Sequence, residues 1–119
     1  MIQVIVEITH YCPCRCPFCT VPKSKKVMPL EHFRRALECF KEFFQEEMSV
    51  VISGGEPSVV DNLRDYVMCA KELGYMVTVA TNAYNPSKVL EAEPDLIEVS
   101  LDYFGKKHDS VRGVKGLFD

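Results

Sequence analysis

Short apolar runs alternate with amphipathic segments along this chain, and that alternation restricts the possible folds more than any other feature of the sequence. We predict strands at residues 2–8, 50–52, 76–80 and 96–101, and helices at about residues 29–47, 63–73 and 86–92. Gly74 supplies a left-handed cap after the second helix, and residues 114–119 are interpreted as the start of a further helix. Strands that alternate with helices form right-handed βαβ units, so the sequence predicts an α/β fold with a parallel sheet.

Each predicted strand is followed by polar or sulfur-bearing residues. These segments lie at residues 12–19, 53–57, 81–82 and 100–102. The carboxyl ends of parallel strands meet at one edge of a sheet, where α/β proteins bind their ligands. We therefore expect one functional site at this edge, built from all four segments.

Composition and charge exclude several classes of protein. Hydrophobic side chains make up 47% of the 119 residues, which is enough for one compact domain over residues 1–119 and too many for a disordered chain. The 14 basic and 17 acidic residues give a net charge of −3, so no attraction to nucleic acid or to an anionic membrane is expected. No apolar run approaches the ~20 residues of a membrane span, and we predict a cytoplasmic protein.

Four of the six cysteines lie between residues 12 and 19. Neighbours this close cannot connect distant parts of a chain through disulfides, so metal binding is the better interpretation. Cys12, Cys16 and Cys19 form a Cys-x3-Cys-x2-Cys pattern with Phe18 before the last cysteine. Three thiolates can hold three irons of a cubane cluster and leave the fourth iron open. The alternative is a structural zinc site with Cys14 as its fourth ligand, and otherwise Cys14 is a bystander thiol.

This spacing resembles the signature of the radical SAM superfamily. The resemblance implies a [4Fe-4S] cluster on Cys12, Cys16 and Cys19 whose open iron is chelated by S-adenosyl-L-methionine. Reductive cleavage of that cofactor would give a 5′-deoxyadenosyl radical that abstracts hydrogen from a substrate. Residues 54–57, Gly-Gly-Glu-Pro, resemble the family segment whose backbone carbonyl and acidic side chain hold the methionyl ammonium.

Three further segments resemble motifs of the same family. They are Thr81-Asn82, where Ala83 replaces a common glycine, then Ser100-Leu101-Asp102, and the stretch from His108 to Gly113, in which Arg112 is expected to meet the carboxylate of the cofactor. The resemblance thus implies that the following residues bind the cofactor: Gly54, Gly55, Glu56, Pro57, Asn82, Ser100, Asp102 and Arg112. No catalytic side chain is assigned.

Most of these residues also have a plain structural interpretation. Residues 54–57 could form only a turn between strand and helix. Asn82 and Asp102 could be turn or cap residues, and Ser100 an ordinary strand residue. Cys39 and Cys69 lie near apolar helical stripes and are expected in the core.

Together these features predict a partial (βα) barrel of radical SAM type with about four βα units. The family usually has six, so the chain looks truncated at its C-terminus, or else a partner or a second copy covers the sheet edge at residues 96–101. The expected function is a radical SAM enzyme, an oxidoreductase or transferase in peptide modification or cofactor biosynthesis. It would need a reductant such as ferredoxin or flavodoxin and an unidentified substrate. The alternative is a non-catalytic zinc or iron–sulfur electron-transfer module.

Overall fold

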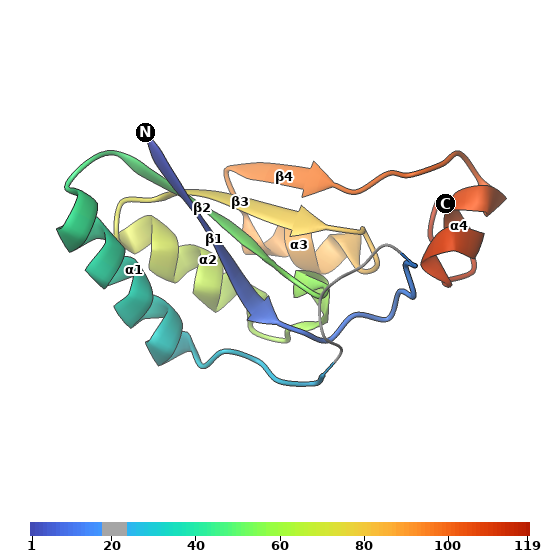
Figure 1. Cartoon of the computed structure of the whole chain (residues 1–119), viewed down its shortest axis with the longest axis horizontal. Coiled ribbons are helices and arrows are strands. Elements are labelled where there is room, and N and C mark those ends of the chain that lie inside the picture. The colour runs from blue at the N-terminus through green and yellow to red at the C-terminus, as the bar shows by residue number, and fades with distance from the viewer. Residues whose placement is uncertain (18–23) are drawn as a thin grey trace.

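The computed structural model describes residues 1–17 and 24–119 of the chain and contains one parallel sheet (Figure 1). The described strands are β1 (Ile2–Thr9), β2 (Met48–Gly54), β3 (Met76–Thr81) and β4 (Leu96–Val99), arranged in the order β1-β2-β3-β4. Every neighbouring pair is parallel, and Ile5, Val51, Thr78 and Leu96 lie side by side in register. The predicted α/β partial barrel is confirmed.

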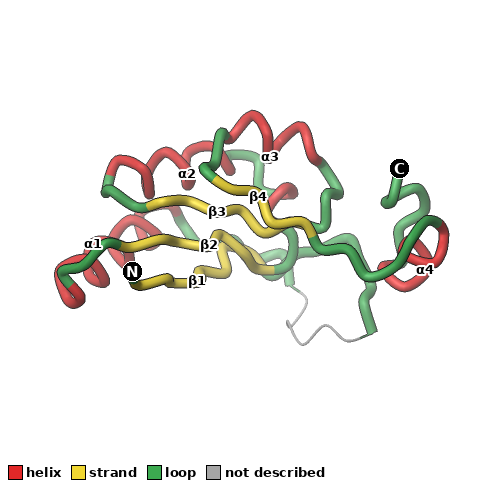
Figure 2. The backbone as a smooth tube through the Cα atoms, turned by 90° about the horizontal axis from the view of Figure 1, so that it is seen from above, coloured by secondary structure: helices red, strands yellow, loops and turns green. Residues whose placement is uncertain are grey.

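Helices connect successive strands and cover one face of the sheet. They are α1 (Leu30–Phe44), α2 (Leu63–Glu72) and α3 (Pro86–Ala92), and a short 3-10 helix, η1 (Pro57–Val59), precedes α2. Figure 2 shows α2 and α3 along the sheet, with α4 (Lys106–Arg112) beyond the carboxyl ends of the strands. In the described part of the chain, no helix has the length and apolar character needed to cross a membrane.

The hydrophobic core fills the space between the sheet and these helices. Val50 and Ile52 of β2 are fully buried, as are Val77 and Val79 of β3, because alternate residues of these strands face the helices. On the helical side, the ring of Phe33 packs edge-to-face on Tyr66, with 5.2 Å between the ring centroids. This packing fixes the positions of the strand ends, where the candidate site lies.

Local signals set several helix boundaries as predicted. Pro29 directly precedes α1, and α3 has the predicted bounds of residues 86–92. After α2, Gly74 adopts a φ of +86°, the left-handed conformation expected of a residue that terminates a helix.

Two predicted elements are wrong in position. The fourth strand ends at Val99, so Ser100 and Leu101 lie outside it, because its neighbour β3 ends at Thr81, the partner of Val99. The last helix is at residues 106–112, and residues 114–119 form no helix. Its cap, Gly113, has a φ of +76°, and the Asp109 carboxylate then accepts hydrogen bonds from the backbone N–H groups of Gly116 and Phe118.

The apolar stripe of α1 is only partly in the core. Phe33 and Leu37 are buried, but Phe43 is 80% exposed, and Phe40 and Phe44 are more than a third exposed. Cys39 is also exposed, whereas Cys69 is buried as predicted. The end of α1 extends beyond the strands in Figure 1, which leaves its last turns without a sheet to cover them.

Candidate functional site

The cysteine-bearing loop follows β1 and is fastened to the backbone of the segment after β2. Gly55 N–H donates to the carbonyl of Thr9 at 2.7 Å, and Glu56 N–H donates to that of Tyr11 at 2.8 Å. The buried hydroxyl of Thr9 donates to the carbonyl of Lys26 at 2.9 Å and accepts from the N–H of Tyr11 at 3.1 Å. These bonds align the start of the loop with the end of β2.

The two glycines are needed for this close approach. A Cβ atom on Gly54 would lie 2.2 Å from the carbonyl oxygen of Thr9, and one on Gly55 would lie 2.2 Å from that of Tyr11. No side chain fits at such distances without displacing backbone. The glycines therefore allow the cysteine loop itself to approach the end of β2, whereas the sequence predicted only that they bind the cofactor.

The carboxylate of Glu56 is turned into the protein. Its two oxygens accept hydrogen bonds from Ser58 N–H at 3.0 Å, the hydroxyl of Thr81 at 2.7 Å and Asn82 N–H at 2.8 Å. Glu56 is fully buried, and the adjacent Pro57, also buried, begins η1. The carboxylate thus connects the end of β2 to the end of β3.

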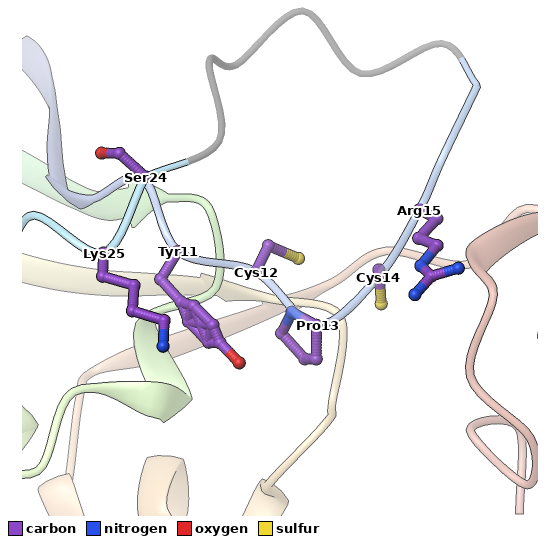
Figure 3. A pocket seen from close by; sticks show the side chains of 7 residues that line it. All are labelled: Tyr11, Cys12, Pro13, Cys14, Arg15, Ser24 and Lys25. Carbon is purple, nitrogen blue, oxygen red and sulfur yellow. The ribbon is translucent and has the colours of Figure 1, made fainter.

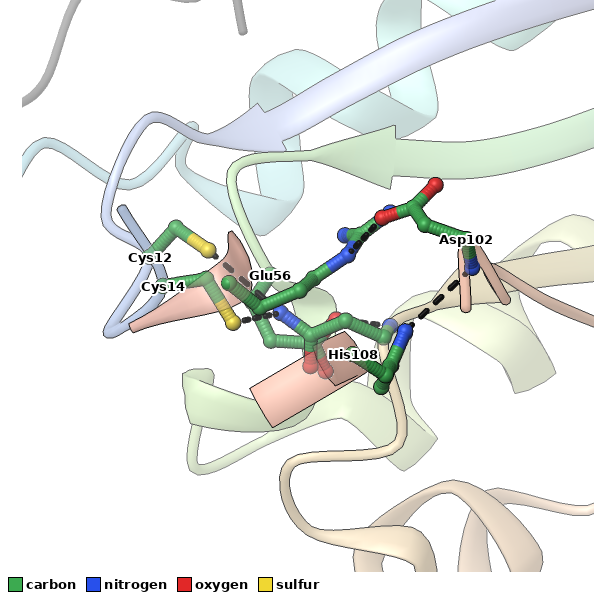
Figure 4. A network of polar contacts seen from close by, with 7 residues as sticks. Cys12, Cys14, Glu56, Asp102 and His108 are labelled. Atoms are coloured by element: carbon green, nitrogen blue, oxygen red, sulfur yellow. Dashed lines mark hydrogen bonds and ion pairs between the residues drawn. The ribbon is translucent and has the colours of Figure 1, made fainter. Parts of the chain in front are cut away.

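The side chain of Asn82 continues this connection to the cysteine loop. Its Nδ2 lies 3.0 Å from the Sγ of Cys14 and 3.4 Å from the Sγ of Cys12, while its Oδ1 accepts from the N–H of Tyr84 at 2.9 Å. Figure 4 shows both sulfur atoms turned toward this network. The Tyr84 contact sets the amide orientation, because it requires the oxygen on that side and places the NH₂ group on the sulfur side.

The cysteines differ in their exposure. Cys14 is buried, whereas Cys12 and Cys16 are half-buried. A hydrogen bond with the Cys12 side chain, and then burial, raise the pKa of the Cys14 thiol well above its ordinary value. Cys19 lies outside the described residues, so the structure does not place the third predicted ligand. Within residues 1–17 and 24–119, no three metal-ligating side chains of the His, Cys, Asp and Glu types converge.

A pocket of about 440 Å³ opens beside the cysteine loop (Figure 3). It is lined by Tyr11, Cys12, Pro13, Cys14, Arg15, Ser24 and Lys25. Its volume lies within the range of about 300–1,000 Å³ that is typical of small-molecule sites. Cys12 and Cys16 supply sulfur donors of the type that iron–sulfur clusters need, on a loop whose backbone is fixed by the sheet. The described residues therefore fit such a cluster in donor type.

The remaining predicted residues come from the segment after β4 and from α4. Arg112 Nε donates to Asp102 Oδ2 at 2.7 Å, and Asp102 N–H donates to Nδ1 of the buried His108 at 3.2 Å. Burial opposes the charge of Arg112, but its hydrogen bond to Asp102 and the nearby Cys16 raise its pKa overall. Arg112 also accepts, through its carbonyl, a hydrogen bond of 2.5 Å from Arg15 N–H. Helix α4 is thereby fastened to the cysteine loop.

The structure thus brings most predicted residues to one edge. Ser100 is exposed there, and its N–H donates to the carbonyl of Thr81 at 2.9 Å. No role was predicted from the sequence for the hydroxyl of Thr81, the hydroxyl of Thr9 or the ring of His108. Each of these residues follows a predicted strand or belongs to one of the motifs above. That position in the sequence is the signal that could have indicated its role.

The open parallel sheet, with a cysteine loop at its carboxyl edge, places the chain among the α/β proteins that bind their ligands at this edge. The family described as the Radical SAM superfamily matches residues 6–119, and the chain belongs to it, which confirms the family assignment made from the sequence. A PqqA peptide cyclase from Bradyrhizobium diazoefficiens is 31% identical over 86 residues, covering 69% of this chain. A pre-heme d1 synthase from Dinoroseobacter shibae is 27% identical over 98% of this chain.

Solved structures share the fold. Streptococcus suis SuiB bound to its precursor peptide SuiA superposes with a TM-score of 0.78 over 95% of this chain, at 21% identity. The chain spans 22% and 30% of the length of the two enzymes above and 27% of the SuiB chain. It therefore corresponds to one part of each of these longer proteins.

Proposed function

We propose that this chain is the part of a radical SAM enzyme that holds the [4Fe-4S] cluster and S-adenosyl-L-methionine. The observation that carries the proposal is the cysteine loop, which the Gly54–Gly55 backbone and Asn82 hold at the carboxyl edge of a parallel sheet. Cys12 and Cys16, with Cys19, would hold the cluster. When bound, the cluster and its cofactor supply the electron and the carbon radical for hydrogen abstraction from a substrate.

The chain's own residues would position these groups. Glu56 uses three acceptor positions of its carboxylate on protein donors, and a carboxylate offers about four. The fourth is the position that we assign to the methionyl ammonium, with Gly54, Gly55 and Pro57 shaping the backbone around it. Asp102, paired with Arg112, and the exposed Ser100 complete the opposite side of the same edge.

We further propose that the substrate is a peptide or a cofactor precursor. The names of the related PqqA peptide cyclase and pre-heme d1 synthase support both classes. The reductant would be a small electron carrier such as ferredoxin or flavodoxin, and the clustering of the cysteines in one loop, which suits metal binding better than disulfides, supports a cytoplasmic location. On β4, Leu96 and Val99 are each 55% exposed, so we propose that a further strand or a partner chain covers this edge.

Anaerobic reconstitution of the 119-residue chain with iron and sulfide tests the proposal directly. We expect close to one [4Fe-4S] cluster per chain and a change of its EPR signal when S-adenosyl-L-methionine is added. Stoichiometric zinc without sulfide would favour the structural metal module instead. A cluster that assembles but does not respond to the cofactor would favour an electron-transfer module.

A further inference from the structure

Asn82 connects the cysteine loop to the buried carboxylate of Glu56: its side chain contacts the loop, and its backbone N–H contacts the carboxylate. Its Nδ2 lies 3.4 Å from Cys12 Sγ and 3.0 Å from Cys14 Sγ, and its N–H donates to Glu56 Oε1 at 2.8 Å. Asn82 is only 5% exposed, so water does not compete freely for its NH₂ group. The two hydrogens of that group match the two sulfur atoms in number.

The orientation of this amide is fixed by its surroundings. Oδ1 accepts from the N–H of Tyr84, which the positive φ of Ala83, +63°, brings back toward the side chain. Ala83 N–H in turn donates to the hydroxyl of Thr81 at 3.0 Å. A reversed amide would place an acceptor against the sulfurs and a donor against Tyr84 N–H, so two favourable contacts would be lost.

We propose that Asn82 is a positioning residue that donates N–H hydrogen bonds to the sulfur of the cluster ligand Cys12 and thereby raises the reduction potential of the cluster. The inference rests on the proposed function. Hydrogen bonds to ligand sulfurs are one of the factors that set the potential of an iron–sulfur cluster. The reduced cluster carries one more negative charge, so a fixed donor stabilises the reduced state more than the oxidised state. The second hydrogen holds Cys14 beside Cys12.

The test compares variants of the reconstituted 119-residue chain. Asn82→Asp keeps the size of the side chain and the acceptor for Tyr84, but it replaces the donor with an acceptor. Asn82→Ala removes both groups. Asn85→Ala is the matched control, because Asn85 is also an asparagine near the end of β3, but its side chain caps α3 by accepting from Lys88 N–H at 3.4 Å. The midpoint potential is measured by spectroelectrochemical titration, and iron and sulfide are counted in each sample.

We expect both Asn82 variants to lower the potential, with the larger shift in Asn82→Asp. At a fixed applied potential, the ratio of reduced to oxidised cluster should fall at least threefold, which is about 28 mV for a one-electron couple with about 59 mV per tenfold change. Asn85→Ala should match the wild type. A purely structural role would lower cluster content but leave the potential of the loaded fraction unchanged.

Several results would overturn the inference. Loaded Asn82 variants with the wild-type potential would show that the donor does not act on the cluster. Failure of both variants to load, with intact far-UV circular dichroism and normal loading of Asn85→Ala, would show that Asn82 serves assembly instead of the potential. A wild-type chain that binds no cluster would refute the proposed function itself, and that control is read first.

Discussion

Removal of the Glu56 carboxylate should be among the most destabilising single changes outside the hydrophobic core. The fully buried carboxylate accepts hydrogen bonds from Ser58 N–H, the hydroxyl of Thr81 and Asn82 N–H. Glu56→Ala leaves these three donors buried without an acceptor. Each such donor costs about 1–3 kcal/mol, so the loss is about 3 kcal/mol even at the lower limit for each donor. A small domain has only about 5–15 kcal/mol of stability in total.

Glu56→Gln provides a graded comparison. In the better of its two amide orientations, the carbonyl oxygen still accepts from Ser58 and Thr81, and the NH₂ group faces only Asn82 N–H. One donor then lacks an acceptor, and we expect a loss of about 1–3 kcal/mol. The free energy of unfolding should therefore be highest for the wild type, lower for Glu56→Gln and lowest for Glu56→Ala. This order follows from the number of donors left without an acceptor.

Urea unfolding followed by far-UV circular dichroism measures these differences. Glu42→Ala is the matched control, because Glu42 is exposed on α1 and its loss should change the free energy of unfolding by no more than about 0.5 kcal/mol. If Glu56→Ala unfolds within about 0.5 kcal/mol of the wild type, the carboxylate does not hold the strand ends together and the reasoning is refuted.

Three further predictions follow from other contacts. Gly55→Ala should destabilise the chain and reduce cluster loading, because its Cβ would lie 2.2 Å from Tyr11 O; normal loading and stability would show that the loop shifts freely. Cys14→Ala should keep cluster content, measured as iron and sulfide, whereas Cys16→Ala should lose most of it; equal losses would favour zinc on all four cysteines. Burial raises the pKa of Tyr75, whose hydroxyl donates to Leu37 O at 2.5 Å, so the unfolded state loses this proton first. The contribution of Tyr75 to the free energy of unfolding is therefore present below its unfolded pKa of about 10 and falls as the pH rises above that value. A pH series of urea unfolding should show a shallower fall in the free energy of unfolding for Tyr75→Phe than for the wild type. Identical slopes would contradict this role of Tyr75.

The elements that the sequence predicted well are those with local signals. Helix α3 has the predicted bounds because Asn85 and Pro86 mark its start within two residues. The end of β4 depends instead on where β3 ends. The pairing that sets it joins Thr81 and Val99, which lie 18 residues apart in the sequence. Helix α4 was placed wrongly because its buried residues, His108 and Arg112, are polar and give no apolar stripe.

The features of the candidate site also differ in whether they depend on neighbouring or on distant residues. Cys12 and Cys16 could be recognised from the sequence as candidate ligands, because their spacing is a local property of the chain. The direction of the Glu56 side chain could not, because its partners Thr81 and Asn82 lie 25 and 26 residues away. A carboxylate next to two glycines is compatible with a ligand and with the protein's own donors, and its contacts with Thr81 and Asn82 become visible only when the strand ends are assembled.

The cysteine loop also explains why so many polar groups are buried at this edge. Residues 10–17 contain no helix or strand, so no regular pattern pairs their backbone groups with one another. Partners come from separate segments: Glu56 N–H for Tyr11, and the carbonyl of Arg112 for Arg15. The shape of the loop is consequently determined by the ends of the strands and by α4 more than by its own sequence. A loop held in this way keeps its sulfur atoms in place without regular structure, which is what the proposed cluster site, with ligands only a few residues apart, would require.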